Sequence, residues 1–477
     1  MSMKQTLLGT SLRIRLLSLF VLAGLTVCVL LAGCSKDPGK PLPNSPPETS
    51  VFVKGTVDTV SYAVKLYWWG QDIDGEVIGF YYRWTCEDSA ASPDTNWVFT
   101  TTKHRDFILP APDGFALQTF WVKAIDNAGE EDPTPARQDF PIRNSMPSVA
   151  LNESTLPDTT LPAVTFLWTG TDPDGNNSIA YYMMWVDGKE DNPIIVVNQD
   201  TTLGPDYLDS YGDRTFYIRA IDEAQGASGT DSHTWYVLAP IGDVLLVDDV
   251  PASVPGAGAA DAFYRSLVDS LVPGGQYTIF DVGSQGSFRS ASEVSLILPL
   301  FQQVVWYGDT RSTPSAALVT GQTGIGEFLD GGGSIFLEGV ALVGDEGSFS
   351  PGFAENYLGI DSLRTRYISP NDPSSTNFDL YNAMVIRANE AVGLDSIRVV
   401  GIYSGCEVMY PSAEAQTLFY LPPGSYSGQT ENYYLGVLMQ DRPYSSVCLT
   451  FPVRRCDGFA NARQEVAKLM TILGVGQ

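Results

Sequence analysis

The chain has 477 residues, with 55 acidic and 28 basic side chains and a formal net charge of −27 at pH 7. Because phosphate binding needs patches of Lys and Arg, this balance argues against a nucleic-acid partner. Such a charge is typical of a well-solvated exterior. No cofactor is expected, and the candidate ions are Ca²⁺ and Mg²⁺.

The N-terminus has the pattern of an export signal. Basic residues precede an apolar stretch at 16–31, as in a secretory signal, and the alternative is a transmembrane anchor. The stretch ends in LAGC, residues 31–34, which resembles the lipobox of bacterial lipoproteins. In that family cleavage precedes the Cys, and several acyl chains anchor it stably to the membrane. The resemblance implies a signal peptide at 1–33 and lipidation of Cys34. Because Ser35 follows, it also implies an outer-membrane lipoprotein of the cell envelope, with surface exposure left open.

An internal repeat follows the N-terminal region. WWGQDIDG at 68–75 corresponds to WTGTDPDG at 168–175, and TFWVKAID at 119–126 corresponds to TFYIRAID at 215–222. Each copy alternates apolar and polar residues, is rich in aromatic and β-branched side chains, and is interrupted by Gly, Pro and Asp. These are strand signals at the spacing of an all-β sandwich, which has about a hundred residues.

We therefore predict a Pro-rich extended tether at 34–49 and two all-β sandwiches at 50–145 and 146–240. The repeated segments resemble the B, C and F strands of fibronectin type III domains, whose Ig-like relatives share these features. In that family the Trp of the early strand and the aromatic residue of the F strand belong to the core. The resemblance implies structural roles for Trp68, Trp168, Phe120 and Phe216.

The Asp-Gly segments within the repeat are compared with calcium loops. With Gly75 at the sixth position of an EF-hand loop, the first and twelfth positions are Gly70 and Tyr81 rather than acids, so the pattern fails. We predict that both segments are hairpin turns, with calcium at a domain junction as the alternative.

From residue 241 onward, apolar strand patterns alternate with helical ones. Ser290 and Glu293 form a capping-box pattern at the start of one helix. The alternation predicts an α/β domain at 241–477 with a mainly parallel, doubly wound sheet, although residues 360–445 break the alternation with extra strands. The expected strands are at 243–249, 276–282, 304–309, 334–342 and 445–452, and the expected helices are at 260–272, 290–303, 324–333 and 461–474.

This region resembles the class I glutamine amidotransferase-like fold, a flavodoxin-like layout, through its strand order and the segments VVWYGD, GGGSIFLEG and TFP. Active members place a Cys on a tight turn after the fourth strand and a His near the last strand. Here the turn FLEGVA carries Glu338, and the last strand has no His. The chain's two histidines, His104 and His233, precede residue 241, which excludes a Cys-His or Ser-His triad within the domain.

Four carboxylates mark the expected strand ends: Asp248, Asp249, Asp309 and Glu338. Because the carboxyl ends of parallel strands meet at one edge, we expect these side chains to lie near that edge. Oxygen ligands suit Ca²⁺ or Mg²⁺, and a bound metal could activate water without a His. The favoured alternative in so acidic a chain is that they cap helices or face solvent.

Cysteine usage adds disulfide candidates in an oxidising compartment. Cys406, Cys448 and Cys456 lie in the C-terminal domain, whereas Cys86 lies in the first sandwich. At most one bridge forms easily within the C-terminal domain, and the sequence does not choose its pairing.

These observations favour an envelope lipoprotein that is non-catalytic and acts in binding, adhesion or as a scaffold. The lipid anchor makes the membrane one partner, and an envelope protein or a glycan is the expected ligand. The competing hypothesis is a metal-assisted extracellular hydrolase of glycan or peptide that uses the acidic edge of the α/β domain.

Overall fold

The computed structural model describes residues 43–53, 60–86, 96–282, 288–310, 316–340, 342–343, 349–363, 378–426, 429–440 and 442–477. The predicted signal peptide, Cys34 and most of the tether lie outside these residues. The chain divides into two compact units, residues 1–144 and 145–477. None of the described helices is long and apolar enough to cross a membrane.

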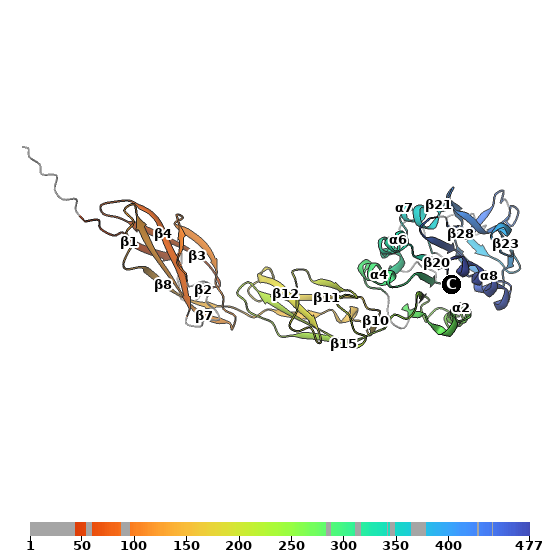
Figure 1. Cartoon of the computed structure of the whole chain (residues 1–477), viewed down its shortest axis with the longest axis horizontal. Coiled ribbons are helices and arrows are strands. Elements are labelled where there is room, and N and C mark those ends of the chain that lie inside the picture. Colours follow the sequence, from red (N-terminus) through yellow and green to blue (C-terminus); the bar gives the residue numbers. More distant parts are fainter. Residues whose placement is uncertain are drawn as a thin grey trace, which may run out of the picture. The chain divides into compact units, whose positions relative to one another are not determined.

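The first unit is a β-sandwich of two sheets, with strand orders β1-β3-β6 and β2-β8-β7-β4-β5 (Figure 1). Side chains in β3 and β7 alternate between buried and less buried positions, as expected of strands with one face on a core. The strands are β1 Glu48–Val53, β2 Val60–Ser61, β3 Ala63–Gln71, β4 Val77–Cys86, β5 Val98–Thr100, β6 His104–Ile108, β7 Phe115–Asp126 and β8 Ala136–Arg143.

The core of the first sandwich is aromatic. Trp68 of β3 and Phe120 of β7 face each other with ring centroids 5.6 Å apart, and Trp84 of β4 lies 5.0 Å from the same phenyl ring. All three side chains are at most 3% exposed. The prediction that Trp68 and Phe120 are structural is confirmed.

The second sandwich repeats this design with sheets β14-β11-β9 and β10-β16-β15-β12-β13. Phe166 and Phe216 stack with centroids 4.1 Å apart, and Trp168 packs against Tyr182 at 5.5 Å. Trp168 and Phe216 are buried, which confirms their predicted role. The strands are β9 Ser148–Leu151, β10 Thr159–Thr160, β11 Val164–Thr171, β12 Ile179–Val186, β13 Ile194–Val196, β14 Asp200–Leu203, β15 Gly212–Asp222 and β16 Asp231–Val237.

The prediction that the Asp-Gly segments are hairpin turns is wrong, because β3 and β4, like β11 and β12, belong to different sheets and each segment crosses between the two sheets of its sandwich. Asp74 accepts a hydrogen bond from the backbone N–H of Ser45 at 3.1 Å, and Asp174 accepts one from Ser145 at 2.7 Å. The 100-residue repeat therefore includes the chain entering each sandwich, NSPP at 44–47 and NSMP at 144–147. These carboxylates tie the segment that enters each module to the connection between its two sheets.

Residues 241–477 form an eleven-stranded sheet of order β18-β17-β19-β20-β29-β28-β27-β23-β24, with β21 and β26 beside it. Within the described residues, β17, β18, β19, β20 and β29 form parallel ladders, and the remaining pairs are antiparallel. The expectation of a mainly parallel sheet is wrong. A short connection such as residues 440–444 between β28 and β29 allows only antiparallel pairing, whereas a parallel pair needs a long crossover.

The strands of this sheet are β17 Val244–Asp248, β18 Thr278–Asp281, β19 Gln303–Tyr307, β20 Ser334–Glu338, β21 Ile360–Leu363, β23 Val385–Ala388, β24 Ile397–Arg398, β26 Met409–Pro411, β27 Gln416–Leu421, β28 Tyr433–Met439 and β29 Ser445–Leu449. A separate two-stranded sheet pairs β22 Phe378–Leu380 with β25 Tyr403–Cys406.

Helices cover both faces of the parallel strands (Figure 1). On one face, α2 Ala257–Leu271 and α8 Gly458–Ile472 pack against alternate strand residues such as Leu246 and Phe336. On the other face, α4 Ala291–Ile297, α5 Ala316–Thr320 and α6 Gln322–Asp330 pack against Leu245 and Ile335. Shorter helical segments among the described residues of 241–477 are the 3-10 turns Pro273–Gly275, Leu298–Leu300, Glu390–Val392 and Val453–Arg455, the helix α7 Pro351–Phe353 and the π-helical segment Ala354–Leu358.

The second sandwich and the C-terminal sheet share contacts inside the second unit. Ser290 caps α4 by accepting the N–H of Glu293 at 3.1 Å, as the capping box predicts. The Glu293 carboxylate accepts the N–H of Arg289 at 2.7 Å and, across the junction, the N–H of Thr165 in β11 at 2.5 Å. Leu161 also belongs to the core under α4. One capping residue therefore orders a helix and joins it to the sandwich.

Candidate functional site

The predicted acidic residues do lie at the carboxyl ends of neighbouring parallel strands. Asp248 ends β17 and Asp249 follows it, Asp309 lies just beyond β19, and Glu338 ends β20. Their exposed fractions are 6%, 1%, 0% and 0%. These carboxylates are interior groups, so each needs a charge partner or hydrogen-bond donors.

Asp309 is paired with two arginines from the far end of the chain. Arg454 donates from Nε to Oδ1 at 3.0 Å and from Nη2 to Oδ2 at 2.6 Å, in the two-pronged geometry that suits a carboxylate. Arg455 adds an Nη2 contact to Oδ2 at 3.3 Å. Both arginines belong to the 3-10 turn Val453–Arg455, shortly after β29. Both oxygens of Asp309 are thus engaged by guanidinium groups.

Glu338 lies beside Asp309. Its Oε2 accepts the N–H of Asp309 at 3.2 Å and its Oε1 accepts the N–H of Val453 at 3.1 Å. Burial, and then the charge of Asp309, raise the pKa of Glu338 to about 8, so it is largely protonated at neutral pH. Burial and the neighbouring Glu338 raise the pKa of Tyr264, which therefore stays neutral.

The backbone of Asp309 adopts φ 45°, in the left-handed region that is uncommon for residues other than Gly. Its carbonyl accepts the N–H of Val340 at 2.9 Å, so hydrogen bonds hold both sides of the residue in place. A strained conformation of this kind persists only where the surroundings fix it. Here β20 and the two arginines do so.

The two aspartates of β17 have separate partners. Asp248 accepts the N–H of Val250 at 3.0 Å, and burial raises its pKa to about 6. Asp249 accepts the indole N–H of Trp306 at 3.0 Å. Asp248 in turn contributes, after burial, to raising the pKa of Tyr307.

The four carboxylates do not share a metal position. Within the described stretches, no group of three or more His, Cys, Asp or Glu residues is arranged to hold a metal ion. Arginine contacts cover Asp309, and backbone N–H groups contact both oxygens of Glu338. The geometry is that of a buried ion pair between Asp309 and two arginines, with Glu338 hydrogen-bonded beside it, and it links β19, β20 and the segment after β29. We call this network the acid–arginine cluster, consisting of Asp309, Glu338, Arg454 and Arg455.

Sequence reasoning missed the two arginines. The signal was present as VRR at 453–455, directly after the last strand and on the same edge as the acids. The residue pair Asp309 and Arg454 is separated by 145 positions, so no local pattern joins them.

The three disulfide candidates are free, buried thiols in the structure, as is the half-buried Cys86. Cys406 and Cys456 belong to the core on the α2 and α8 face of the sheet, whereas Cys448 belongs to the core on the α4 and α6 face. Burial raises the pKa of all three thiols, so none is a reactive thiolate at neutral pH. Only Cys406 and Cys456 share a face.

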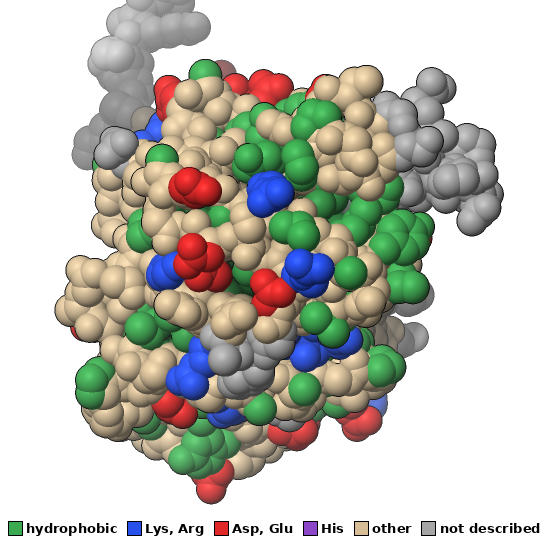
Figure 2. Space-filling view, turned by 90° about the vertical axis from the view of Figure 1, so that its right-hand side faces the viewer, with side chains coloured by type: hydrophobic (Ala, Val, Ile, Leu, Met, Phe, Trp, Pro, Cys, Tyr) green, Lys and Arg blue, Asp and Glu red, His purple; other side chains and the backbone are tan. Residues whose placement is uncertain are grey.

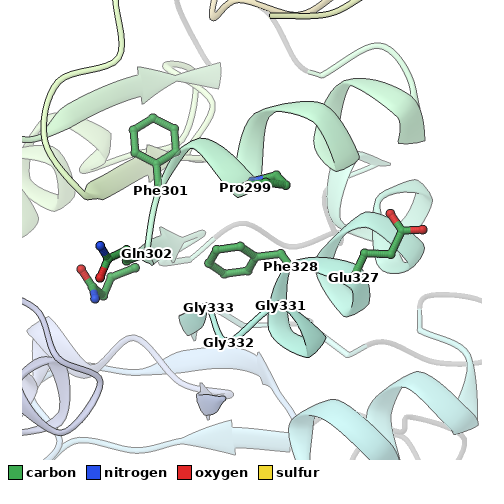
Figure 3. A pocket seen from close by; sticks show the side chains of 9 residues that line it. Pro299, Phe301, Gln302, Glu327, Phe328, Gly331, Gly332 and Gly333 are labelled. Carbon is green, nitrogen blue, oxygen red and sulfur yellow. The ribbon is translucent and has the colours of Figure 1, made fainter. Parts of the chain in front are cut away.

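A cavity of about 430 Å³ lies at the opposite, amino-terminal edge of the parallel strands (Figure 3). Figure 3 shows the Phe328 ring beside the segment 331–333, with Glu327 directed away from it. A Cβ on Gly333 would come within 2.3 Å of the Phe328 ring, so glycine there permits this packing. Glu327 is the one titratable residue in the described lining, which makes this cavity a weak candidate for chemistry.

No protein-family model matches the chain, and no curated protein matches its sequence. Among solved structures, it is similar to the fibronectin(III)-like modules of Clostridium thermocellum CbhA, with 15% identity over 39% of this chain and 94% of that one and a TM-score of 0.20. A two-domain fibronectin type III segment of chicken tenascin is 13% identical over 40% of this chain and all (100%) of that one, with a TM-score of 0.18. The mmIFT52 N-terminal domain is 12% identical over 49% and 97%, with a TM-score of 0.29. The two β-sandwiches are established by the strand pairing within this chain itself.

Proposed function

We propose that the protein is an envelope-anchored lipoprotein that binds an envelope protein or a glycan, or acts as a scaffold, and that it does not catalyse a reaction. In this proposal acyl chains on Cys34 hold the chain at the outer membrane, and the two sandwiches act as spacers for the C-terminal domain. The lipobox-like LAGC at 31–34 supports the anchor. The sandwich interiors are filled with aromatic side chains, which supports a spacer role for these modules.

The proposal includes two finer fold relationships. We infer that the sandwiches are fibronectin type III or Ig-like modules, because each carries the core Trp in an early strand and the core aromatic in a later one. We infer that the C-terminal domain is related to the class I glutamine amidotransferase-like, flavodoxin-like fold. The order β18-β17-β19-β20-β29 of its parallel strands, with helices on both faces, supports this relationship.

One observation favours binding over catalysis. The carboxylate after β19 is held by two arginines, and residues 241–477 contain no His that could serve as a base. A metal-assisted hydrolase would need carboxylate oxygens free to hold a cation or a water molecule. Here arginines and backbone N–H groups occupy those oxygens.

The anchor is tested by labelling with an alkyne-bearing palmitate in a bacterial host. The full chain is expected to carry the label and enter the membrane fraction, and Cys34→Ser is expected to lose both. An unlabelled, membrane-free wild type would contradict the anchor.

Catalysis is tested by incubating the purified chain with polymeric envelope glycan and with casein. No new reducing ends or amino termini are expected. Product formation that disappears in Asp309→Asn would support the hydrolase instead.

A further inference from the structure

The antiparallel part of the C-terminal sheet contains a second concavity, of about 560 Å³. It is formed by β23, β27 and the beginning of β28. We call it the tyrosine groove. The lining residues that matter here are Arg387, Asn389, Glu390, Tyr420, Asn432 and Tyr434.

Strand register places three of these side chains in one row. Arg387 of β23 pairs with Tyr420 of β27, which pairs with Tyr434 of β28. Residues directly opposite each other on adjacent strands point to the same face. The two tyrosine rings lie with centroids 6.3 Å apart and planes inclined by 50°. The row is therefore a wall of two rings with a guanidinium at one end.

Polar groups of fixed position surround these rings. Asn389 donates to the carbonyl of Thr417 at 2.9 Å and accepts the N–H of Ala391 at 3.1 Å, which orients its amide. Asn432 donates to the Tyr434 hydroxyl at 3.4 Å. Across the described part of the chain, the Arg387 guanidinium forms no ion pair, in contrast to Arg454. Arg387 and Glu390 are both exposed and supply one cation and one carboxylate.

The balance of charge in the groove points to an uncharged ligand. The charges of Arg387 and Glu390 cancel each other, and the chain's net charge of −27 would repel an anionic polymer. Figure 2 shows the end of the molecule nearest β23, where basic and acidic side chains alternate without a patch of one sign. Nucleic acid and acidic polysaccharide fit such a surface poorly.

The chemistry of the lining narrows the ligand further. Tyrosine offers a flat apolar ring with a polar hydroxyl, and pockets fix orientation with a few placed amides and charges. A ligand that matches this surface has an apolar C–H face and many hydroxyl groups around its rim, as a pyranose ring does. The cavity lies within the range of about 300–1,000 Å³ that is usual for ligand sites.

We propose that the tyrosine groove binds a neutral polysaccharide segment. Tyr420 and Tyr434 stack against pyranose faces, while Arg387, Glu390 and the two asparagine amides exchange hydrogen bonds with ring hydroxyls. This inference rests on the proposed binding function and names its ligand class and its residues.

The test is calorimetric titration of the folded mature chain, made soluble by Cys34→Ser, with hexasaccharides. The probes are cellohexaose, maltohexaose, xylohexaose and the hexamer of N-acetylglucosamine, and hexagalacturonate is the anionic arm. At least one neutral probe is expected to bind, and Tyr420→Ala and Tyr434→Ala are each expected to weaken that binding tenfold or more. Tyr434→Phe, which keeps the ring, is expected to weaken it less than Tyr434→Ala.

The matched control is Tyr211→Ala, because Tyr211 is 54% exposed and belongs to the second sandwich. It is expected to bind as the wild type does. Binding of none of the neutral probes, binding of hexagalacturonate alone, or equal binding by wild type and both alanine variants would overturn the proposal. If no neutral hexasaccharide binds but the full chain is lipidated at Cys34, the groove proposal is rejected and the anchored scaffold stands. If the full chain is not lipidated, the anchor is rejected, and binding in the groove can still be measured.

Discussion

Two regions of one sheet treat their charged residues in opposite ways. At the carboxyl edge of the parallel strands, Asp309 and Glu338 are fully buried and the arginines after β29 satisfy Asp309. In the tyrosine groove, Arg387 and Glu390 remain exposed beside half-buried rings. The difference shows that acidic residues at the ends of parallel strands do not by themselves form a catalytic or metal-binding site. Whether those acids have internal partners decides whether the edge is structural or open to a ligand.

Breaking the acid–arginine cluster is expected to destabilise the protein most. Arg454→Ala leaves a buried carboxylate with only Arg455, and we expect it to lower the free energy of unfolding by roughly 3 kcal/mol, as for other broken buried pairs. The measurement is urea unfolding at neutral pH. The control is Arg442→Ala, which removes an exposed pair with Glu414 and is expected to lower the free energy of unfolding far less. Equal, small losses in the two variants would show that the cluster is not structural.

The second prediction is that the free energy of unfolding depends on pH through the buried Glu338, whereas the exposed residues of the tyrosine groove add no such dependence. Glu338 has a pKa of about 8 in the folded chain against an ordinary 4.5, so the folded state holds a proton that the unfolded state releases. The stabilisation that the protonated Glu338 gives to the folded state is complete below about pH 4.5 and is lost as the pH rises through about 8. Unfolding free energy should therefore fall across this window, by up to about 1 kcal/mol per pH unit.

Glu338→Gln should flatten this dependence, because an amide does not titrate. Urea melts between pH 5 and pH 8.5 would measure the slope, with the exposed Glu327→Gln as control. Asp248, with a pKa of about 6, still causes a smaller fall in the free energy of unfolding between about pH 4 and pH 6, both in the wild type and in Glu338→Gln. An unchanged slope in Glu338→Gln would contradict the assignment of a protonated, buried Glu338.

A substitution in the tyrosine groove is expected to change the stability of the protein least. Arg387→Ala removes a guanidinium that is exposed, so it should change the free energy of unfolding by no more than about 0.5 kcal/mol. A loss comparable to that of Arg454→Ala would show that Arg387 has a structural role. The same urea melts provide this measurement.

The sequence predicted much of the local structure of both regions. Continuous apolar runs indicated β17, β19 and β20, and helical spacing indicated α2, because each pattern comes from neighbouring residues. The acids at the strand ends were placed correctly for the same reason. Their partners were not found, because the arginines lie about 145 positions away and pairing depends on the folded sheet.

Two other features depended on contacts that no local pattern contains. The Ser290 half of the capping box was correct, but the Glu293 carboxylate accepts the N–H groups of Arg289 and of Thr165, which lies 128 positions away in the sandwich. The parallel sheet was extended by antiparallel strands, and the groove that they form depends on the register of Arg387, Tyr420 and Tyr434. Alternation along one strand assigns its side chains to the two faces, but a shift of two residues against the next strand leaves that assignment unchanged.

We infer that the acidic edge is an internal ion-pair network and not a cation site. The most direct test compares the melting temperature of the wild type and of Asp309→Asn during titration with Ca²⁺ and, separately, Mg²⁺, at about 0.15 M salt, where exposed charges are screened. A cation bound by the folded state raises the melting temperature in a saturable way. We predict the same small, non-saturating shift in both proteins; a saturable rise in the wild type that is absent in Asp309→Asn would contradict the claim.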